Sequence, residues 1–185
     1  MRIVGGRYRG RALAAPRAHD IRPTSDRLRE SLFNVLVHAY GDLVTDARVL
    51  DLFAGTGALG LEAMSRGAAF ALFVDEGAEA RALIRENVAT FGLGGATRIF
   101  RRDATKLGPA HPIEPFSLAF LDPPYGRGLA QQALLSAQAG GWLAANALIV
   151  VEEAAAAAFA APMGFTEVER RRYDDTELVF LTIAR

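Results

Sequence analysis

The tetrapeptide Asp122-Pro123-Pro124-Tyr125 is the most distinctive chemical feature of this sequence. It follows a run of mostly apolar residues, so we expect it at the end of a strand. Successive prolines fix the backbone φ angle and carry no N–H donor, and the local carbonyl groups therefore act as rigid acceptors beside an aromatic ring. This arrangement suits an amino group on a flat base.

The exocyclic nitrogen of a nucleobase is a poor nucleophile because its lone pair is delocalised into the ring. We hypothesise that the Asp122 carboxylate and the Pro123 carbonyl accept its two N–H bonds, while Tyr125 stacks on an extruded base. No metal is required for this chemistry. The proton leaves through Asp122 or to water, and the sequence does not distinguish these routes. A rigid Pro-Pro turn without chemistry is the alternative interpretation.

A glycine-rich turn forms the second candidate site. It directly follows a predicted strand, and its glycines let the backbone approach a ligand beside a helix N-terminus. Asp75 lies 18 residues beyond Gly57 and closes the next predicted strand, where nicotinamide enzymes place a ribose-binding carboxylate. A nicotinamide-dependent dehydrogenase is therefore an alternative function for this chain. The turn residues assigned to cofactor binding are Asp51, Phe53, Gly55, Thr56 and Gly57.

The carboxylate of Asp51 favours S-adenosylmethionine over a dinucleotide. It would repel a pyrophosphate at the end of the first strand, and it would attract the ammonium of a methionyl group. Asp75 would then accept from the ribose hydroxyls and Asp103 from the adenine amine, so that one ligand uses three strand-end carboxylates. The competing explanation is that these aspartates only begin turns or cap helices.

The elements that position these residues alternate between short apolar runs and helical patterns. Near-continuous apolar strands alternating with helices indicate an α/β fold with a mostly parallel sheet covered on both faces. In such sheets, ligands bind beyond the carboxyl ends of the strands. Helices are predicted near 26–40, 57–66, 78–91 and 129–139, with a short alanine-rich helix after 153, and strands near 48–53, 69–75, 97–103, 116–122, 147–153, 164–172 and 177–183, the last two forming an antiparallel hairpin.

Composition limits the protein class. The 185 residues suffice for one main domain, the absence of cysteine excludes thiol nucleophiles and disulfides, and the three histidines show no ligand spacing. No apolar run reaches the length of a membrane span or a signal peptide, so we expect a soluble, cytoplasmic protein that binds no metal and no membrane. A monomer is the default expectation.

Charge is distributed unevenly along the chain. Residues 1–30 contain eight arginines and three acidic residues, whereas the remainder carries a net charge of −5. This pattern suits a basic arm, residues 1–24, that contacts phosphates, followed by a domain over 25–185. A solvated basic surface without a partner is the alternative. Within the first segment, Gly5-Gly6 and Pro16 indicate a hairpin.

Together these motifs resemble the RsmD-type small-subunit ribosomal RNA guanine-N2 methyltransferases, a family of Rossmann-like class I methyltransferases. The resemblance covers nearly the whole chain. It implies a seven-stranded sheet with an antiparallel last strand, S-adenosylmethionine as cofactor, and methylation of one guanine N2 in small-subunit rRNA, on a partly assembled subunit. The segments that carry it are IVGGRYRGRAL at 3–13, RPTSDRLRESLFNVL at 22–36, LDLFAGTGALGLEAMSRGA at 50–68, FVDE at 73–76 and LDPPYGRGL at 121–129.

The resemblance also implies further site residues. The segment 22–29 would lie beside the cofactor and the target base, which gives Thr24 and Asp26 a cofactor role that helix capping would otherwise explain. Glu76 follows Asp75 in the family's acidic pair. The residues assigned to RNA are Arg7, Tyr8, Arg9 and Arg11 in the arm, together with Arg22, Arg27 and Arg127. Two departures are Gly77, where the family usually has a longer residue, and Asp174-Asp175, which replaces a Gly-Asp turn.

Three other functions remain open on the sequence alone. A DNA amino methyltransferase acting on adenine N6 or cytosine N4 would use the same Asp-Pro-Pro-Tyr chemistry, although so short a chain leaves no room for a separate DNA-recognition domain. A nicotinamide oxidoreductase would use the glycine turn and Asp75. A non-catalytic RNA-binding assembly factor would use only the basic arm.

Overall fold

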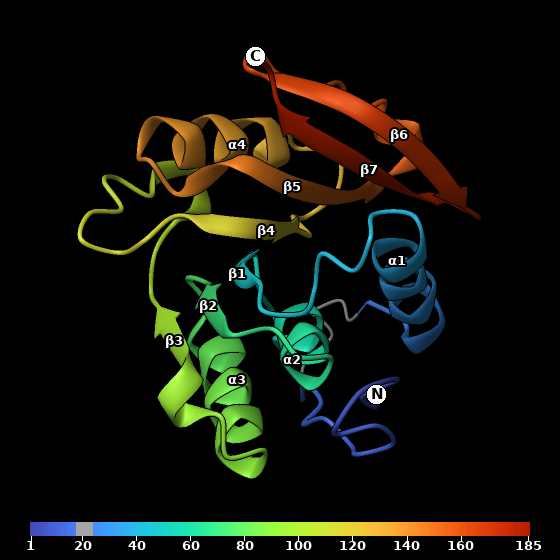
Figure 1. The fold of residues 1–185 in the computed structure, drawn as a ribbon, viewed down its shortest axis with the longest axis vertical. Helices are drawn as coiled ribbons and strands as arrows, with labels where there is room; N and C mark the ends of the chain where they lie inside the picture. The colour runs from blue at the N-terminus through green and yellow to red at the C-terminus, as the bar shows by residue number, and fades with distance from the viewer. Residues whose placement is uncertain (18–23) are drawn as a thin grey trace.

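A seven-stranded mixed sheet forms the centre of the molecule in this computed structural model, which describes residues 1–17 and 24–185 (Figure 1). The strand order is β3-β2-β1-β4-β5-β7-β6. Neighbours from β3 to β5 pair in parallel, whereas β7 is antiparallel to both β5 and β6. The strands are β1 Arg48–Leu52, β2 Phe70–Val74, β3 Thr97–Phe100, β4 Phe116–Leu121, β5 Leu143–Ala154, β6 Phe165–Tyr173 and β7 Thr176–Ile183. The predicted fold class is confirmed.

Helices cover both faces of this sheet. The first face packs against the helices α1 Asp26–His38, α2 Ala58–Ser65 and α3 Ala78–Thr90. The second face packs against α4 Leu129–Ala139 and the short 3-10 helix η2 Ala104–Lys106. Alternate strand residues point to the two cores: Val49 belongs to the first and Leu50 to the second. This alternation places the Asp51 side chain on the α2 side.

The N-terminal residues form the predicted hairpin, and it is docked on the domain. Arg2 pairs with Ala12 in an antiparallel bridge, and the chain turns at Gly6 and Gly10. Ile3 and Leu13 are buried in the first core, so part of the hairpin contributes to the fold. The predicted boundary at residue 24 borders residues 18–23, which lie outside the described residues.

Three elements differ from the sequence-based expectation. The edge strand β3 ends at Phe100, so Asp103 follows it in a loop and caps η2. Strand β5 begins at Leu143 because this residue pairs with Phe116 before a register shift between Phe116 and Leu118. The expected alanine-rich helix is only the 3-10 turn η3 Ala155–Ala157. The two-residue turn at Asp174-Asp175 joins β6 to β7 as predicted.

Candidate active site

A cavity of about 820 Å³ opens at the carboxyl ends of β1, β2 and β4. The glycine turn after β1 and the Asp-Pro-Pro-Tyr segment after β4 both line it, so the two candidate sites of the sequence share one cavity. Of the residues assigned to catalysis or cofactor binding, those lining it are Thr24, Asp51, Phe53, Gly55, Thr56, Asp75, Glu76, Asp103, Asp122, Pro123, Pro124 and Tyr125. Arg127 also lines the cavity.

The glycine turn is held in place by Asp75. One carboxylate oxygen of Asp75 accepts from the Gly55 N–H at 2.9 Å, and the other accepts from the Gly77 N–H at 2.8 Å. Gly57 then begins α2 at a φ of +79°, in the left-handed region that favours glycine. Asp75 thereby fixes the backbone that faces the cavity.

Asp51 lies at the base of the same turn. Its side chain is 1% exposed, and its Oδ2 accepts from the Gly60 N–H at 3.0 Å. A Cβ on Gly60 would lie 2.5 Å from the Phe73 ring, so only glycine lets α2 approach this carboxylate closely. Burial, assisted by the nearby Asp75, raises the pKa of Asp51 to about 8. A cation bound beside Asp51 would therefore favour its ionised form.

Asp103 caps a short helix and also lines the cavity. Its Oδ1 accepts from the backbone N–H of Thr105 at 2.8 Å and from the Thr105 hydroxyl at 2.7 Å, which caps η2. These hydrogen bonds lower the pKa of Asp103 and keep it ionised. Because the residue also lines the cavity, capping does not remove it from the site.

The Asp-Pro-Pro-Tyr segment leaves β4 with its polar groups anchored on both sides. The Asp122 Oδ2 accepts from the Thr24 hydroxyl at 3.1 Å, and the Tyr125 hydroxyl donates to the Glu152 Oε1 at 2.7 Å. Burial and the negative charge of Glu152 raise the pKa of Tyr125, so its hydroxyl keeps its proton. The tyrosine ring is therefore restrained at the cavity wall.

Sequence reasoning missed two buried carboxylates behind this segment, Glu152 and Glu153. They close β5 and are 6% and 2% exposed. Glu153 accepts from the Gly126 N–H at 3.1 Å, and Glu152 contacts both Thr24 and Tyr125. The strand-end rule that selected the aspartates applies equally to Ile149–Glu153, where two acidic residues end an apolar run.

Some assigned residues do not reach the cavity. Gly57 does not line the cavity, and a Cβ at this position would lie 3.2 Å from Ile84 and 3.3 Å from Phe73. Asp26 does not line the cavity, and its Oδ1 pairs with Arg29 at 2.9 Å. Arg27 is exposed on α1. Arg22 lies outside the described residues.

The arm residues gather at the opposite end of the helices from the cavity. The Arg7 N–H donates to the carbonyl of Ser65, the last residue of α2, and an Arg11 guanidinium N–H donates to the carbonyl of Thr90, the last residue of α3. The Tyr8 ring packs on Phe91 with centroids 5.0 Å apart, and Arg7 and Arg11 flank it. Arg9 is exposed beside them.

Two structural features are absent from residues 1–17 and 24–185. These residues contain no group of three or more acidic or histidine side chains placed to hold a metal ion. Nor do they contain a helix of the length and apolar character that crossing a bilayer requires.

Residues 1–182 match the family described as "Conserved hypothetical protein 95". The chain is also 42% identical over 152 residues to "Ribosomal RNA small subunit methyltransferase D" of Escherichia coli (strain K12), covering 82% of this chain and 74% of that protein. It belongs to the RsmD-type methyltransferase family.

Other members of the RsmD-type family agree in sequence and structure. The protein of the same name from Haemophilus influenzae is 34% identical over 154 residues, covering 82% of this chain and 78% of that protein. The solved structure of yhhF from Escherichia coli superposes with a TM-score of 0.84 at 33% identity, covering 99% of this chain and 97% of that chain. The Rossmann-like fold and the family therefore extend over the described chain.

Proposed function

We propose that this protein transfers a methyl group from S-adenosylmethionine to the exocyclic N2 amine of a guanine in small-subunit ribosomal RNA. The observation that carries this proposal is the shared cavity, in which the glycine turn after β1 and the Asp-Pro-Pro-Tyr segment after β4 face the same space. The names of the E. coli and H. influenzae relatives support small-subunit rRNA as the substrate.

The cavity suits S-adenosylmethionine better than a dinucleotide. About 820 Å³ is ample for a ligand of this size. Asp51, Asp75 and Asp103 present acceptors to a ligand whose ammonium, ribose hydroxyls and adenine amine are donors. The same carboxylates would repel a pyrophosphate. We assign Phe53, Gly55, Thr56, Thr24 and Glu76 to the surrounding contacts, because they line the same cavity.

The chain's own groups then orient the target amine. When bound, the cofactor supplies an electrophilic methyl group. The Asp122 carboxylate and the Pro123 carbonyl accept the two N–H bonds of the amine, which directs its lone pair toward the cofactor. Pro124 keeps this loop rigid, and Tyr125, restrained by its hydrogen bond to Glu152, stacks on the extruded base.

The basic residues bind RNA around this site in our proposal. Arg127 lines the cavity and would contact a phosphate beside the extruded nucleotide. The arm residues Arg7, Tyr8, Arg9 and Arg11 would hold RNA farther from the reacting base. A partly assembled small subunit in the cytoplasm would offer such an extended surface.

Mapping of modified nucleosides tests the proposal directly. Small-subunit rRNA from cells lacking the gene should lose one N2-methylguanine, and the wild-type gene should restore it. Asp122→Ala should not restore it, although the affinity of the purified variant for S-adenosylhomocysteine should stay within several-fold of wild type. Glu114→Ala removes an exposed carboxylate outside the cavity and serves as the control. Unchanged rRNA, or methylation of DNA instead, would contradict the proposal.

A further inference from the structure

The buried carboxylate of Glu152 connects three separate parts of the candidate active site. Glu152 lies in β5, and only 6% of its surface is exposed. Its Oε1 accepts from the Tyr125 hydroxyl at 2.7 Å, and its Oε2 accepts from the Thr24 hydroxyl at 3.1 Å. Thr24 is itself 7% exposed and precedes α1. These contacts extend from the cavity wall into the protein interior.

The Thr24 hydroxyl stands between two carboxylates. Its oxygen lies 3.1 Å from the Asp122 Oδ2 and 3.1 Å from the Glu152 Oε2. A hydroxyl carries one hydrogen, so it donates to one of these oxygens at a time. The hydroxyl therefore joins the two carboxyl groups, and it can pass a proton from one to the other by accepting on one side while it donates its own hydrogen on the other.

We propose that Glu152 takes up the proton that the target amine loses, by way of Asp122 and the Thr24 hydroxyl. This inference rests on the proposed function, because it assigns a destination to the proton released by methyl transfer. It adds a proton acceptor that does not itself touch the substrate.

The proton balance closes within these groups. Once the new N–C bond has formed, the nitrogen carries a positive charge, and its N–H bond breaks as an O–H bond forms on Asp122. Asp122 then passes that proton to the Thr24 oxygen, while Thr24 passes its own hydrogen to the Glu152 Oε2. Asp122 and Thr24 end as they began, and Glu152 becomes neutral. After product release, the same steps in reverse return the proton to water at Asp122, which is partly exposed.

Neighbouring groups direct the proton to Glu152. Tyr125 cannot be the acceptor, because its hydroxyl already carries a proton and donates it to Glu152. That hydrogen bond uses Oε1 and persists when Oε2 is protonated. The guanidinium of Arg29 donates to the Thr24 carbonyl at 3.3 Å and fixes the backbone that carries the relaying hydroxyl. Once on Glu152, the proton is shielded from water, because that side chain is buried.

Paired substitutions separate proton uptake from simple positioning. Glu152→Gln retains an oxygen for Tyr125 and an N–H₂ group for Thr24, but it cannot take up a proton. We expect its rate of rRNA methylation to fall about 10²-fold, as for the loss of an acid–base group, with the RNA KM and S-adenosylhomocysteine affinity within several-fold of wild type. Glu114→Gln, an exposed change outside the cavity, should keep the wild-type rate.

Two further variants test the route. Thr24→Ser keeps the hydroxyl and should lose much less of the methylation rate than Thr24→Val, which should lose as much as Glu152→Gln. Added formate should partly restore Glu152→Ala, because a small carboxylate can occupy the space and accept the proton. A wild-type rate for Glu152→Gln, or equal rates for the two Thr24 variants, would overturn the relay alone. A wild-type enzyme that does not methylate rRNA would overturn the proposed function and the relay with it.

Discussion

A single buried carboxyl group, Asp51, sets the electrostatic state of the cavity beside the glycine turn. Its pKa is raised to about 8, chiefly by burial, so it is mostly neutral at pH 7 when no cation lies beside it. An ammonium group binding there would favour ionisation and gain a charge-assisted hydrogen bond. The carboxyl group therefore lowers protein stability when ionised, and in our proposal the same form binds the ammonium group of the ligand.

Asp51→Asn should separate these two effects. The pKa of Asp51 is about 8 in the folded protein and about 3.9 in the unfolded chain, so the folded state binds more protons between these values. The free energy of unfolding of the wild type therefore falls as pH rises from about 4 to about 8, whereas this contribution is absent in the variant. At pH 9 the variant should be more stable by about 1 kcal/mol or more, which is about 2–4 °C in Tm.

The same variant should bind S-adenosylhomocysteine about tenfold more weakly at pH 8, because an amide cannot pair with the ammonium charge. Thermal unfolding at several pH values and calorimetry measure the two effects. Asp46→Asn is the matched control, since Asp46 is exposed and asparagine tolerates its φ of +63°. A variant with lower stability and unchanged affinity would show that Asp51 acts only as a structural acceptor for Gly60.

At the scale of single residues, the sequence predicted which residues line the cavity better than it predicted their contacts. Asp51, Asp75 and Asp122 meet at one cavity because parallel strands bring their carboxyl ends to one edge. The contacts of Glu152 could not be predicted, because Thr24 and Tyr125 lie 128 and 27 residues away from it in the sequence. A pattern read along the chain identifies strand ends, but it does not reveal which side chains meet across them.

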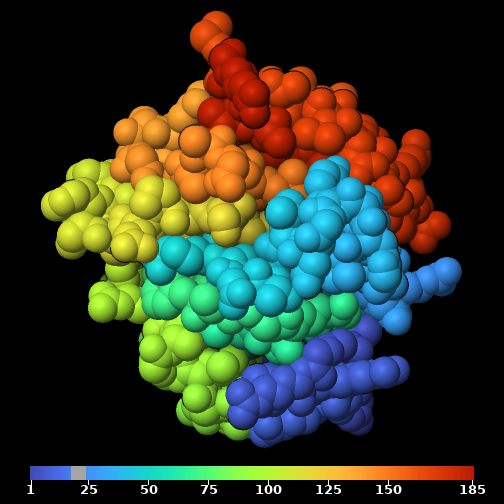
Figure 2. Space-filling view, in the orientation of Figure 1, coloured from blue at the N-terminus to red at the C-terminus, as the bar shows by residue number. Residues whose placement is uncertain are grey.

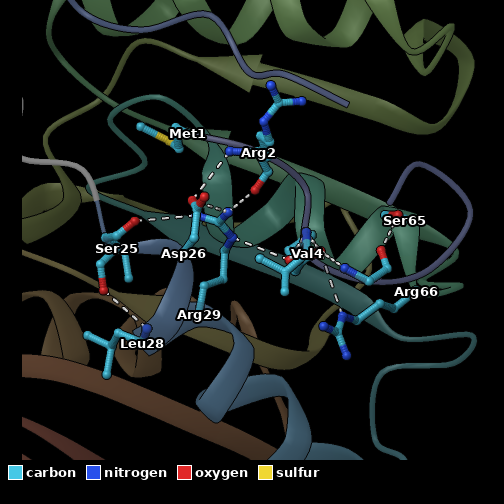
Figure 3. Close-up of polar contacts among 12 residues, drawn as sticks. Met1, Arg2, Val4, Ser25, Asp26, Leu28, Arg29, Ser65 and Arg66 are labelled. Atoms are coloured by element: carbon cyan, nitrogen blue, oxygen red, sulfur yellow. Dashed lines mark hydrogen bonds and ion pairs between the residues drawn. The ribbon is translucent and has the colours of Figure 1, made fainter. Parts of the chain in front are cut away.

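At the scale of elements, a buried ion pair joins the N-terminal hairpin, α1 and α2. Arg29 and Glu62 are both fully buried, with the Arg29 Nε 3.3 Å from the Glu62 Oε1. The Glu62 carboxylate also accepts from the Val4 N–H at 2.8 Å. Figure 3 shows the Arg29 side chain directed toward Asp26 and the backbone of Arg2, to which it donates. One arginine therefore fixes the hairpin beside the helix that begins at the glycine turn.

Arg29→Met should destabilise the protein by about 3 kcal/mol, because it leaves the Glu62 carboxylate buried without its main counter-ion. Denaturant unfolding measures the loss. Hydrogen exchange at the Val4 amide should accelerate as well, since the hairpin loses part of its attachment. Arg27→Met removes an exposed arginine from the same helix and should change stability by no more than about 0.5 kcal/mol. Equal stability of the two variants would contradict the role of the ion pair.

Two details of the elements could not be predicted from the apolar pattern. The apolar spacing on 26–40 predicted α1 correctly, but it could not assign Arg29 to the interior, because an arginine is ordinarily exposed. The strand predicted over 97–103 stops at Phe100, where the edge strand leaves its neighbour β2. Both differences arise from partners that lie far away in the sequence.

At the scale of the whole molecule, the charged surface and the reacting groups are separated. Figure 2 shows the hairpin at the opposite end of the molecule from β6 and β7, packed against α3. The hairpin arginines contact the carboxyl ends of α2 and α3, whereas the cavity lies at the amino ends of these helices. Helix α2 has 8 residues, about 12 Å at 1.5 Å per residue. RNA held at both places would therefore extend over more than the reacting nucleotide.

This separation predicts how a single hairpin arginine acts. Arg9→Ala removes an exposed charge, so RNA affinity should fall and the slope of log K against log salt should become shallower by about 0.7–0.9. The single-turnover rate at saturating RNA should stay within about twofold of wild type in this prediction, because the hairpin does not line the cavity. Filter binding at several salt concentrations, combined with single-turnover methylation, measures both quantities. Arg185→Ala is an equal charge change at an exposed residue beyond β7, which runs antiparallel to β5 and ends at the sheet edge away from the cavity, so it should leave the slope unchanged. Equal slopes for the two variants would mean that RNA does not contact the hairpin at Arg9, and a large loss of rate in Arg9→Ala would mean that this arginine helps to position the reacting base.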